Sequence, residues 1–186
     1  MRIIFRIHGR RLLREALSDK GRRPVQEEFA VREHEIEYRI ATGEDMELLM
    51  SSRLEMLREV NDLPQGYVFD RLLVEESRAY FAEGRQTTVL ALEERTVVGC
   101  ATLCYIGVMP TFSHPTGKRA HLMNVYTKKA YRRQGIAARM AELLIQEARD
   151  RGGTEISLDA TLSGRPLYEK LGFAPSAECM VLCIGE

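Results

Sequence analysis

One segment limits the folds open to this chain more than any other: a β-rich run passes through a basic, glycine-containing turn straight into a helix. It covers residues 124–137 and reads Asn-Val-Tyr-Thr-Lys-Lys-Ala-Tyr-Arg-Arg-Gln-Gly-Ile-Ala. Gly135 lets the backbone turn tightly, so the first N–H groups of the helix are expected to point outward without partners. Because the helix dipole adds positive potential there, the turn predicts a binding site for a diphosphate group.

The charges around this turn favour the same prediction. Arg132 and Arg133 lie in the turn, and Lys128 and Lys129 precede it. Basic side chains at a helix N-terminus are electrostatically unfavourable unless an anion binds there. The alternative is an ordinary helix start with solvated charges. A dinucleotide-binding turn fits less well, because the sequence lacks the pattern G-x-G-x-x-G.

The order of hydrophobic patterns predicts one α/β (α+β) domain, built around a mixed sheet with helices on both faces. Helices are expected over residues 42–60, 69–82, 135–151 and 166–171. Strands are expected over residues 36–40, 87–92, 97–106, 121–127, 155–160 and 180–184. Residues 107–118 contain two prolines and two glycines, which predicts a long loop.

Residues 1–35 are expected to form a basic arm ahead of a domain at residues 36–186. Residues 1–24 hold eight Lys or Arg against two acidic side chains, a net charge of +6, so the rest of this neutral chain carries −6. We expect the arm, with one helix over residues 11–18, to be solvated or docked on its own domain rather than bound to nucleic acid. The apolar run at residues 3–5 is too short for a secretory signal.

Length and composition exclude several classes of protein. The chain has 186 residues, of which 45% are hydrophobic and 29% are charged, and this fits one globular domain rather than a disordered chain. It lacks a run of about eighteen apolar residues, so no membrane-spanning helix is expected. The formal charge of zero removes the basic excess that is typical of nucleic-acid-binding proteins.

Four cysteines form two C-x3-C pairs inside apolar runs: Cys100 with Cys104, and Cys179 with Cys183. Residues four apart point to the same face of a strand, so buried, reduced thiols are expected. Zinc sites show tighter spacing in turn-rich loops, and we therefore expect no metal. Reduced thiols without a signal peptide predict a cytoplasmic protein.

Two short motifs together resemble the GNAT superfamily of acyl-CoA N-acyltransferases. Residues 132–137, Arg-Arg-Gln-Gly-Ile-Ala, are similar to its signature Gln/Arg-x-x-Gly-x-Gly/Ala. Residues 167–173, Leu-Tyr-Glu-Lys-Leu-Gly-Phe, resemble its C-terminal Leu-Tyr-x-x-x-Gly-Phe segment. The motifs stand in the family's order and at its usual separation. The resemblance covers about residues 36–184 and leaves the basic arm unexplained.

The resemblance implies a mostly antiparallel sheet whose fourth and fifth strands, residues 121–127 and 155–160, splay apart beside a bulge. Pantetheine would lie in the gap, along the backbone of residues 123–125, and the amides of residues 133–138 would hold the pyrophosphate. Thr161 stands where members often carry Asn. The cofactor-binding residues implied in this way are Met123, Asn124, Val125, Arg132, Arg133, Gln134, Gly135, Ile136, Ala137, Ala138 and Thr161.

The resemblance also implies that Tyr168 gives a proton to the coenzyme A thiolate, although a tyrosine simply packed on the sheet is the alternative. The base that takes the proton of the amine stays open. His121 and His114 are candidates for it, and surface or structural roles fit both residues. Acidic side chains near the end of the first helix either attract a cationic amine or form a solvated face: Glu55, Glu59 and Asp62. Two aromatic side chains either line an acceptor pocket or anchor core and loop: Tyr126 and Phe112.

These features predict an N-acetyltransferase that moves an acetyl group from acetyl-CoA to a primary amine by direct attack in a ternary complex. The acceptor is a small molecule, a peptide or a protein that the sequence does not identify. The alternative is a catalytically silent acyl-CoA-binding module, whose basic arm recruits a partner or nucleic acid. For the enzyme we expect acetyl-CoA and an amine as partners, no membrane and no nucleic acid; a homodimer is left open.

Overall fold

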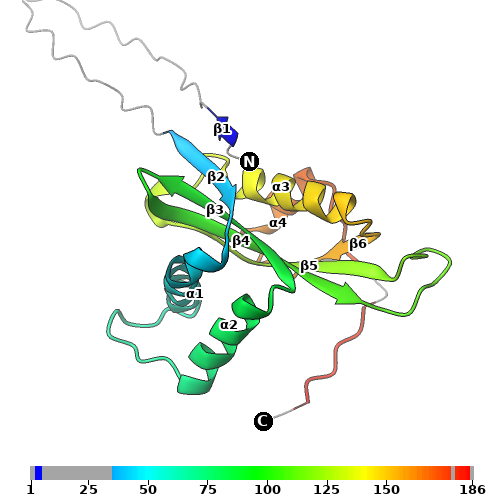
Figure 1. Ribbon diagram of the computed structural model, residues 1–186, viewed down its shortest axis with the longest axis horizontal. Coiled ribbons are helices and arrows are strands. Elements are labelled where there is room, and N and C mark those ends of the chain that lie inside the picture. The colour runs from blue at the N-terminus through cyan, green and yellow to red at the C-terminus, as the bar shows by residue number, and fades with distance from the viewer. Residues whose placement is uncertain (1–2, 6–34, 177–178, 185–186) are drawn as a thin grey trace, which may run out of the picture.

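The computed structural model describes residues 3–5, 35–176 and 179–184 of the chain. A single sheet runs through the molecule, and helices lie on both of its faces (Figure 1). The strands are β1 (Ile3–Phe5), β2 (Ile36–Ile40), β3 (Gln86–Glu93), β4 (Thr96–Gly107), β5 (Lys118–Thr127) and β6 (Glu155–Ser157). The helices are α1 (Met46–Val60), α2 (Arg71–Glu83), α3 (Ile136–Asp150) and α4 (Arg165–Lys170), with short 3-10 turns η1 (Gly43–Asp45) and η2 (Lys129–Tyr131).

The sheet confirms the predicted fold class. Its six strands follow one another in the order β1 to β6, and each neighbouring pair is antiparallel except β5 and β6, which are parallel. Helices α1 and α2 lie on one face, and α3 and α4 lie on the other (Figure 1). Parallel strands need a crossover, and α3 supplies it between β5 and β6.

Two apolar layers hold this arrangement together. On one side of the sheet, α3 presents side chains every fourth residue, so that one stripe of the helix packs against the strands: Ile136, Met140, Leu144 and Ala148. On the other side, Leu49 and Met56 of α1 pack against β3 and β4. The central strands are therefore buried on both faces, and β3 is buried without interruption over residues 87–92.

The predicted splay of two strands is visible in the hydrogen-bond register. β5 pairs with β6 over three residues only, Arg119–His121 with Glu155–Ser157. Beyond His121, β5 continues for six residues, while the chain after Ser157 leaves the sheet. A bulge lies in the same stretch, because Cys100 faces Tyr126 whereas Thr102 faces Met123.

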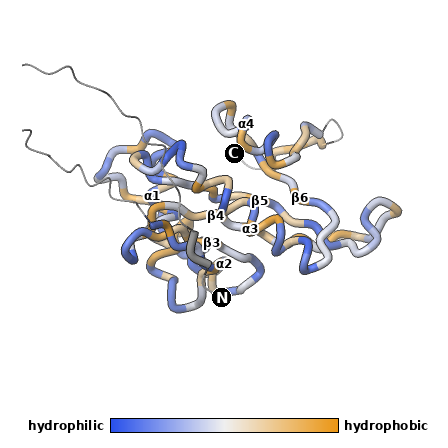
Figure 2. Tube along the Cα trace, turned by 90° about the horizontal axis from the view of Figure 1, so that it is seen from above, coloured by the Kyte–Doolittle hydropathy of each residue, from blue (hydrophilic) through white to orange (hydrophobic). Residues whose placement is uncertain are grey.

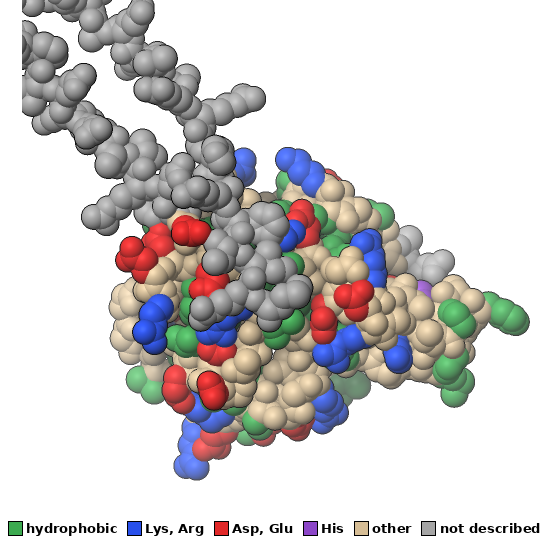
Figure 3. Space-filling model, turned by 45° about the horizontal axis from the view of Figure 1, so that its top comes forward, with side chains coloured by type: hydrophobic (Ala, Val, Ile, Leu, Met, Phe, Trp, Pro, Cys, Tyr) green, Lys and Arg blue, Asp and Glu red, His purple; other side chains and the backbone are tan. Residues whose placement is uncertain are grey.

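The loop between β4 and β5 extends away from the sheet. Residues 108–117, between β4 and β5, form the expected loop, which reaches beyond the sheet and has a hydrophobic tip (Figure 2). Phe112 is fully exposed in this loop, so it is not a core residue. Acidic and basic side chains intermingle on the face of the described residues shown in Figure 3.

The C-terminal prediction was wrong. Residues 180–184 were expected to form a strand, but they lie outside the sheet, and four of their apolar side chains are 82–96% exposed. Cys100 and Cys104 are buried as expected, whereas Cys179 and Cys183 are exposed. The segment has a β-rich composition, but a strand forms only where its backbone finds a partner, and here it finds none among the described residues.

The division into an arm at residues 1–35 and a domain at residues 36–186 stays a prediction. Residues 3–5 of the arm pair with β2 as strand β1. The helix expected over residues 11–18 lies outside the described residues. Among the helices that the structure describes, none combines the length and the apolar character that crossing a membrane requires.

Candidate active site

The basic turn before α3 has open backbone amides. Gly135, at the N-cap, has a φ of 83°, and Arg133 has a φ of 63°. The first bond of the helix runs from the N–H of Arg139 to the carbonyl of Gly135, at 3.0 Å. Within the described part of the chain, the N–H groups of residues 133–138 have no hydrogen-bond acceptor. These amides and the helix dipole therefore form a concave site for an anion.

Some side chains of the turn bond to the rest of the protein, whereas Arg133 is exposed to solvent. Arg132 donates from Nε to the carbonyl of Thr127 at 2.9 Å and forms an ion pair with Glu59 on α1. Gln134 donates to the carbonyl of Ala130 at 3.3 Å. Arg133 is exposed. The turn is thus held by Arg132, and Arg133 is left facing solvent beside the open amides.

The α3 residues that follow are partly or fully covered. Ile136 is buried in the core, so only its backbone is available to a ligand. Ala137 and Ala138 are half-buried. Small side chains at these two positions leave the start of the helix accessible.

A strained asparagine shapes the strand beside this turn. Asn124 has a φ of 54° and lies at the bulge of β5. Its side-chain oxygen accepts from Arg53 on α1 at 3.3 Å, and its side-chain nitrogen donates to Thr102 at 3.4 Å. The neighbouring strand β4 and helix α1 thus hold the bulge, since the Cys100 thiol of β4 also donates to the Asn124 carbonyl at 3.5 Å. Past His121, the edge of β5 that faces away from β4 has no strand partner in the described ranges.

Tyr168 lies on α4 beside a large cavity. The cavity has a volume of about 770 Å³ and lies between β6, α4 and the segment that follows α4. The ring of Tyr168 packs edge-to-face on Phe173, with centroids 5.9 Å apart. Its hydroxyl has no hydrogen-bond partner among the described residues, and burial raises its pKa above the usual value. The hydroxyl therefore stays protonated at neutral pH and is free to donate.

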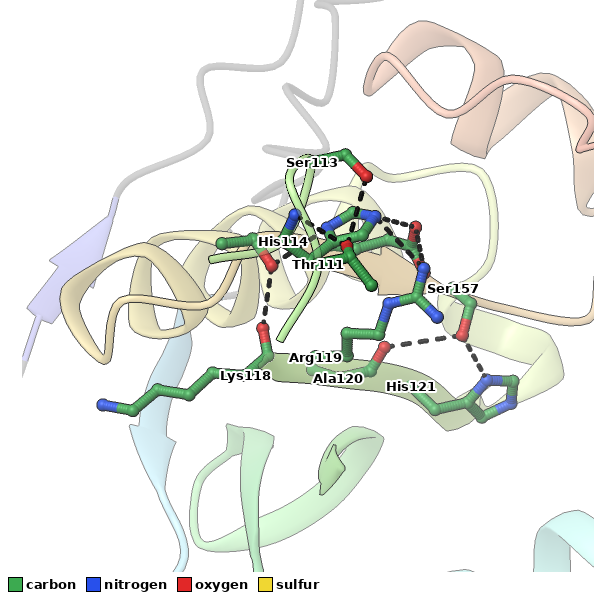
Figure 4. A network of polar contacts seen from close by, with 10 residues as sticks. Thr111, Ser113, His114, Lys118, Arg119, Ala120, His121 and Ser157 are labelled. Atoms are coloured by element: carbon green, nitrogen blue, oxygen red, sulfur yellow. Dashed lines mark hydrogen bonds and ion pairs between the residues drawn. The ribbon is translucent and has the colours of Figure 1, made fainter. Parts of the chain in front are cut away.

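The two candidate bases, His121 and His114, have different surroundings (Figure 4). The Nδ1 of His121 lies 2.9 Å from the hydroxyl of Ser157, and its Nε2 lies 3.7 Å from a carboxylate oxygen of Asp159. In His114 both ring nitrogens are engaged, with Thr154 at 3.1 Å and with Arg119 and Glu155 at 3.2 and 3.3 Å. His114 thus ties the loop of residues 108–117 to β6.

The acidic side chains at the end of α1 are already engaged. The hydroxyl of Tyr126 donates to Glu55 at 3.3 Å and to Glu59 at 3.1 Å. Lys128 lies 3.7 Å from Glu55, and Arg132 pairs with Glu59. Burial and the two nearby carboxylates raise the pKa of Tyr126, which is a core residue with its hydroxyl satisfied. Asp62 is exposed at the end of the helix.

Thr161 shapes the turn that leads into α4. Its side-chain oxygen accepts from the N–H of Gly164 at 3.1 Å, and its carbonyl accepts from Arg165 at 3.0 Å. The hydroxyl is thus part of a local turn. Met123, at the bulge of β5, is 39% exposed.

Sequence reasoning missed Arg53 and Asp159. Arg53 follows Leu49 by four residues and precedes Met56 by three, so a cation stands on the apolar stripe of α1. That position is the signal that could have identified it. Asp159 alternates with apolar neighbours in the way of any exposed strand residue, so no local signal distinguishes it.

The comparisons with known proteins agree with this geometry. Residues 54–173 match the model of the Acetyltransferase (GNAT) family. Human N-acetyltransferase 8 is 32% identical over 107 residues, which are 55% of this chain and 44% of that protein. The match to human N-acetyltransferase 8B has the same extent. The matched region thus spans less than half the length of these curated relatives.

Solved structures show the same fold. A predicted acetyltransferase from Clostridium acetobutylicum, crystallised with acetyl-CoA, is 30% identical with a TM-score of 0.70, covering 80% of this chain and 96% of that one. A GCN5-related N-acetyltransferase from Ralstonia eutropha is 27% identical with a TM-score of 0.63, covering 81% and 99%. The family model, these relatives and the splayed sheet lead to one conclusion: the chain belongs to the GNAT family of acetyltransferases.

Proposed function

We propose that this protein transfers an acetyl group from acetyl-CoA to a primary amine by direct attack in a ternary complex. The observation that carries the proposal is the set of open amides at residues 133–138, next to the free edge of β5. A diphosphate fits the first feature, and an extended chain of amides fits the second. The family membership and the acetyl-CoA of the Clostridium relative support the same ligand.

The residues of this chain fit the parts of acetyl-CoA in order. The amides of residues 133–138 would hold the diphosphate, with the exposed Arg133 adding positive charge. The backbone of residues 123–125, turned by the bulge, would pair with the pantetheine arm. A backbone N–H near Val125 would polarise the thioester carbonyl. The local role of Thr161 leaves its hydroxyl less free for the ligand than the sequence predicts.

The transfer needs two proton movements. The nitrogen of the amine bonds to the acetyl carbon, the carbon–sulfur bond breaks, and its electron pair goes to the sulfur. Tyr168 is the proposed donor to that sulfur. An unperturbed phenol with a pKa near ~10 protonates a thiolate near ~8.5 at a cost of about 2 kcal/mol, and burial raises the pKa of Tyr168 and therefore this cost. Tyr168 thus acts mainly by hydrogen bonding before the proton moves.

His121 is the proposed proton acceptor for the amine. When Ser157 donates to the carbonyl of Ala120, at 3.4 Å, the Nδ1 of His121 donates to Ser157 and its Nε2 carries the lone pair. Both ring nitrogens of His114 lie within hydrogen-bond distance of a partner, whereas the described partner of the His121 Nε2 is the exposed carboxylate of Asp159, at 3.7 Å, which pairs with the ring once it is protonated. We expect His121→Gln to lower kcat about ten- to a hundredfold. His114→Gln would leave kcat within about twofold, and equal losses in both variants would remove His121 from the mechanism.

A Tyr168→Phe variant tests the enzymatic proposal. Without the phenol, kcat should fall about ten- to a thousandfold, while the Kd of acetyl-CoA stays nearly the same. Tyr105→Phe is a matched control, because Tyr105 is also half-buried against the same core and hydrogen-bonds to Thr87 instead. Release of free thiol from acetyl-CoA with a panel of amines gives the rate. Tight binding without thiol release above buffer would favour the silent acyl-CoA-binding module.

The same proposal includes a homodimer in the cytoplasm. Support for the dimer comes from the exposed apolar side chains of the C-terminal segment, since soluble monomers rarely expose such runs: Met180, Val181, Leu182 and Ile184. All four cysteines are free, which fits a reducing compartment. Light scattering on the full chain should give twice the chain mass, and Leu182→Glu should shift it toward one chain. A monomer at micromolar concentration in both samples would contradict the dimer.

A further inference from the structure

One cation on the sheet-facing side of α1 has no anionic partner within the described part of the chain. Arg53 lies between Leu49 and Met56 on the buried stripe of the helix, and its guanidinium donates to the side chain of Asn124 at 3.3 Å. Among the residues that the structure describes, no carboxylate lies within ion-pair distance of Arg53. Burial lowers the pKa of this guanidinium, because the charged form is incompletely solvated. Such a charge gains stability when an anion binds beside it.

The surrounding charges do not compensate for Arg53. The two acidic side chains that lie further along α1, Glu55 and Glu59, bond to the Tyr126 hydroxyl and pair with Lys128 and Arg132. They are therefore not available to attract a cationic acceptor. Among the described residues, the charge that stays unpaired on this side of α1 is therefore the positive charge of Arg53.

Arg53 also lies next to the place where the acyl group is expected. Its partner Asn124 is the bulge residue of β5, between Met123 and Val125. Along the same strand, Met123 pairs with Thr102 and His121 pairs with Cys104, so these side chains share the sheet face that α1 covers. When the amine of an acceptor lies between His121 and the bulge, a second group on the same acceptor, next to the amine, can reach the guanidinium of Arg53.

We infer that the acceptor carries a carboxylate next to its reacting amine, as α-amino acids do, and that Arg53 binds this carboxylate. A guanidinium presents two parallel N–H donors, which match the two oxygens of a carboxylate. The inference rests on the proposed function, because it names the acceptor of that reaction. In this inference, Glu55 and Glu59 at the end of α1 have a structural role, and Arg53 is the residue that selects the acceptor.

Two mixtures test this inference: the natural α-amino acids, and the corresponding amino-acid amides at equal concentration. With saturating acetyl-CoA, the amino acids should release thiol at least about tenfold faster than the amides. Arg53→Gln should lower kcat/KM for the amino acids about ten- to a hundredfold, mainly through KM, and abolish the preference. Arg53→Lys should restore part of it. Equal use of both mixtures, or an unchanged preference in Arg53→Gln, would overturn the inference.

A binding readout separates this inference from the proposed function. Thermal melting of the protein loaded with coenzyme A should shift upward with the amino-acid mixture and not with the amides, and Arg53→Gln should lose the shift. A shift of this kind without thiol release would uphold Arg53 and contradict the acetyl transfer. Thiol release without any difference between the mixtures would uphold the acetyl transfer and contradict the role of Arg53. Arg58→Gln is the control on the same helix, because Arg58 stacks over Phe69 at 5.5 Å and should leave the preference unchanged.

Discussion

The first backbone N–H groups of a helix need acceptors from outside the helix, and the N-termini of α2 and α3 differ in whether the protein supplies them. At α2, the carboxylate of Asp70 accepts from the N–H groups of Leu72 and Leu73, at 2.8 and 3.2 Å. At α3, the N-cap is Gly135, which has no side chain to offer. The first helix end is capped by the protein itself, whereas the amides of the second have no acceptor among the residues that the structure describes.

The charges at the two ends follow the same division. Arg71 opens α2, but it follows the acidic N-cap Asp70 and pairs with Glu75 one turn later. Neither helix has an acidic side chain in its first turn, but the N-cap of α2 is the acidic Asp70, whereas the turn before α3 is basic. Because a helix N-terminus favours negative charge, the end of α3 has a deficit that a bound diphosphate removes. This difference is the reason why we propose the N-terminus of α3, and not that of α2, as the diphosphate site.

The strongest way to break this comparison is to change the glycine at the open end. Gly135→Val forces a branched side chain into a φ of 83°, so the turn must rearrange and its amides disperse. We expect acetyl-CoA affinity, measured by calorimetry, to fall about a hundredfold, since several charge-assisted bonds are lost together. Gly84→Val is the matched control at the other end of α2, where φ is 71°. It should lose stability alone, and equal affinity losses would show that the effect is general strain.

Reversing a charge at each helix end should give a smaller effect. Arg133→Glu places a carboxylate beside the open amides, and we expect acetyl-CoA to bind about tenfold more weakly at low salt. The loss should shrink at high salt, because Arg133 is exposed and its field is screened. Arg71→Glu makes the same change at the closed end and should leave the affinity unchanged. An Arg133→Glu protein with unaltered affinity would exclude this side chain from the site.

The smallest effect is expected from removing the cap of α2. Asp70→Ala leaves the N–H groups of Leu72 and Leu73 without their acceptor, which costs about 1 kcal/mol of unfolding free energy. For a domain of this size, Tm should fall by roughly 2–4 °C. Acetyl-CoA affinity should not change. A large loss of affinity in this variant would mean that both helix ends contribute to binding.

Local features of the site could be predicted from the sequence, because short-range chemistry decides them. Gly135 before a regular apolar repeat fixes both the turn and the start of α3. The Leu-Tyr segment likewise positions Tyr168 on α4. The alternation of β-rich runs placed most strands within a few residues of their observed bounds.

Features that depend on distant contacts could not be predicted. The ion pair between Arg132 and Glu59 joins residues far apart in the sequence, so the turn gives no sign that one of its arginines is engaged. The positive φ of Asn124 depends on Arg53 and Thr102, which belong to other elements. The segment at 180–184 failed for a related reason, because β propensity describes a residue's preference and not the presence of a neighbouring strand.

The account depends most directly on the amides before α3, and amide resonances of isotope-labelled protein report on them residue by residue. Coenzyme A should shift the resonances of residues 133–138, whereas pantetheine, which lacks the diphosphate, should shift those near the β5 bulge alone. The Leu72 and Leu73 amides should stay constant in both titrations. If coenzyme A binds and residues 133–138 do not respond, the diphosphate lies elsewhere and the central claim is wrong.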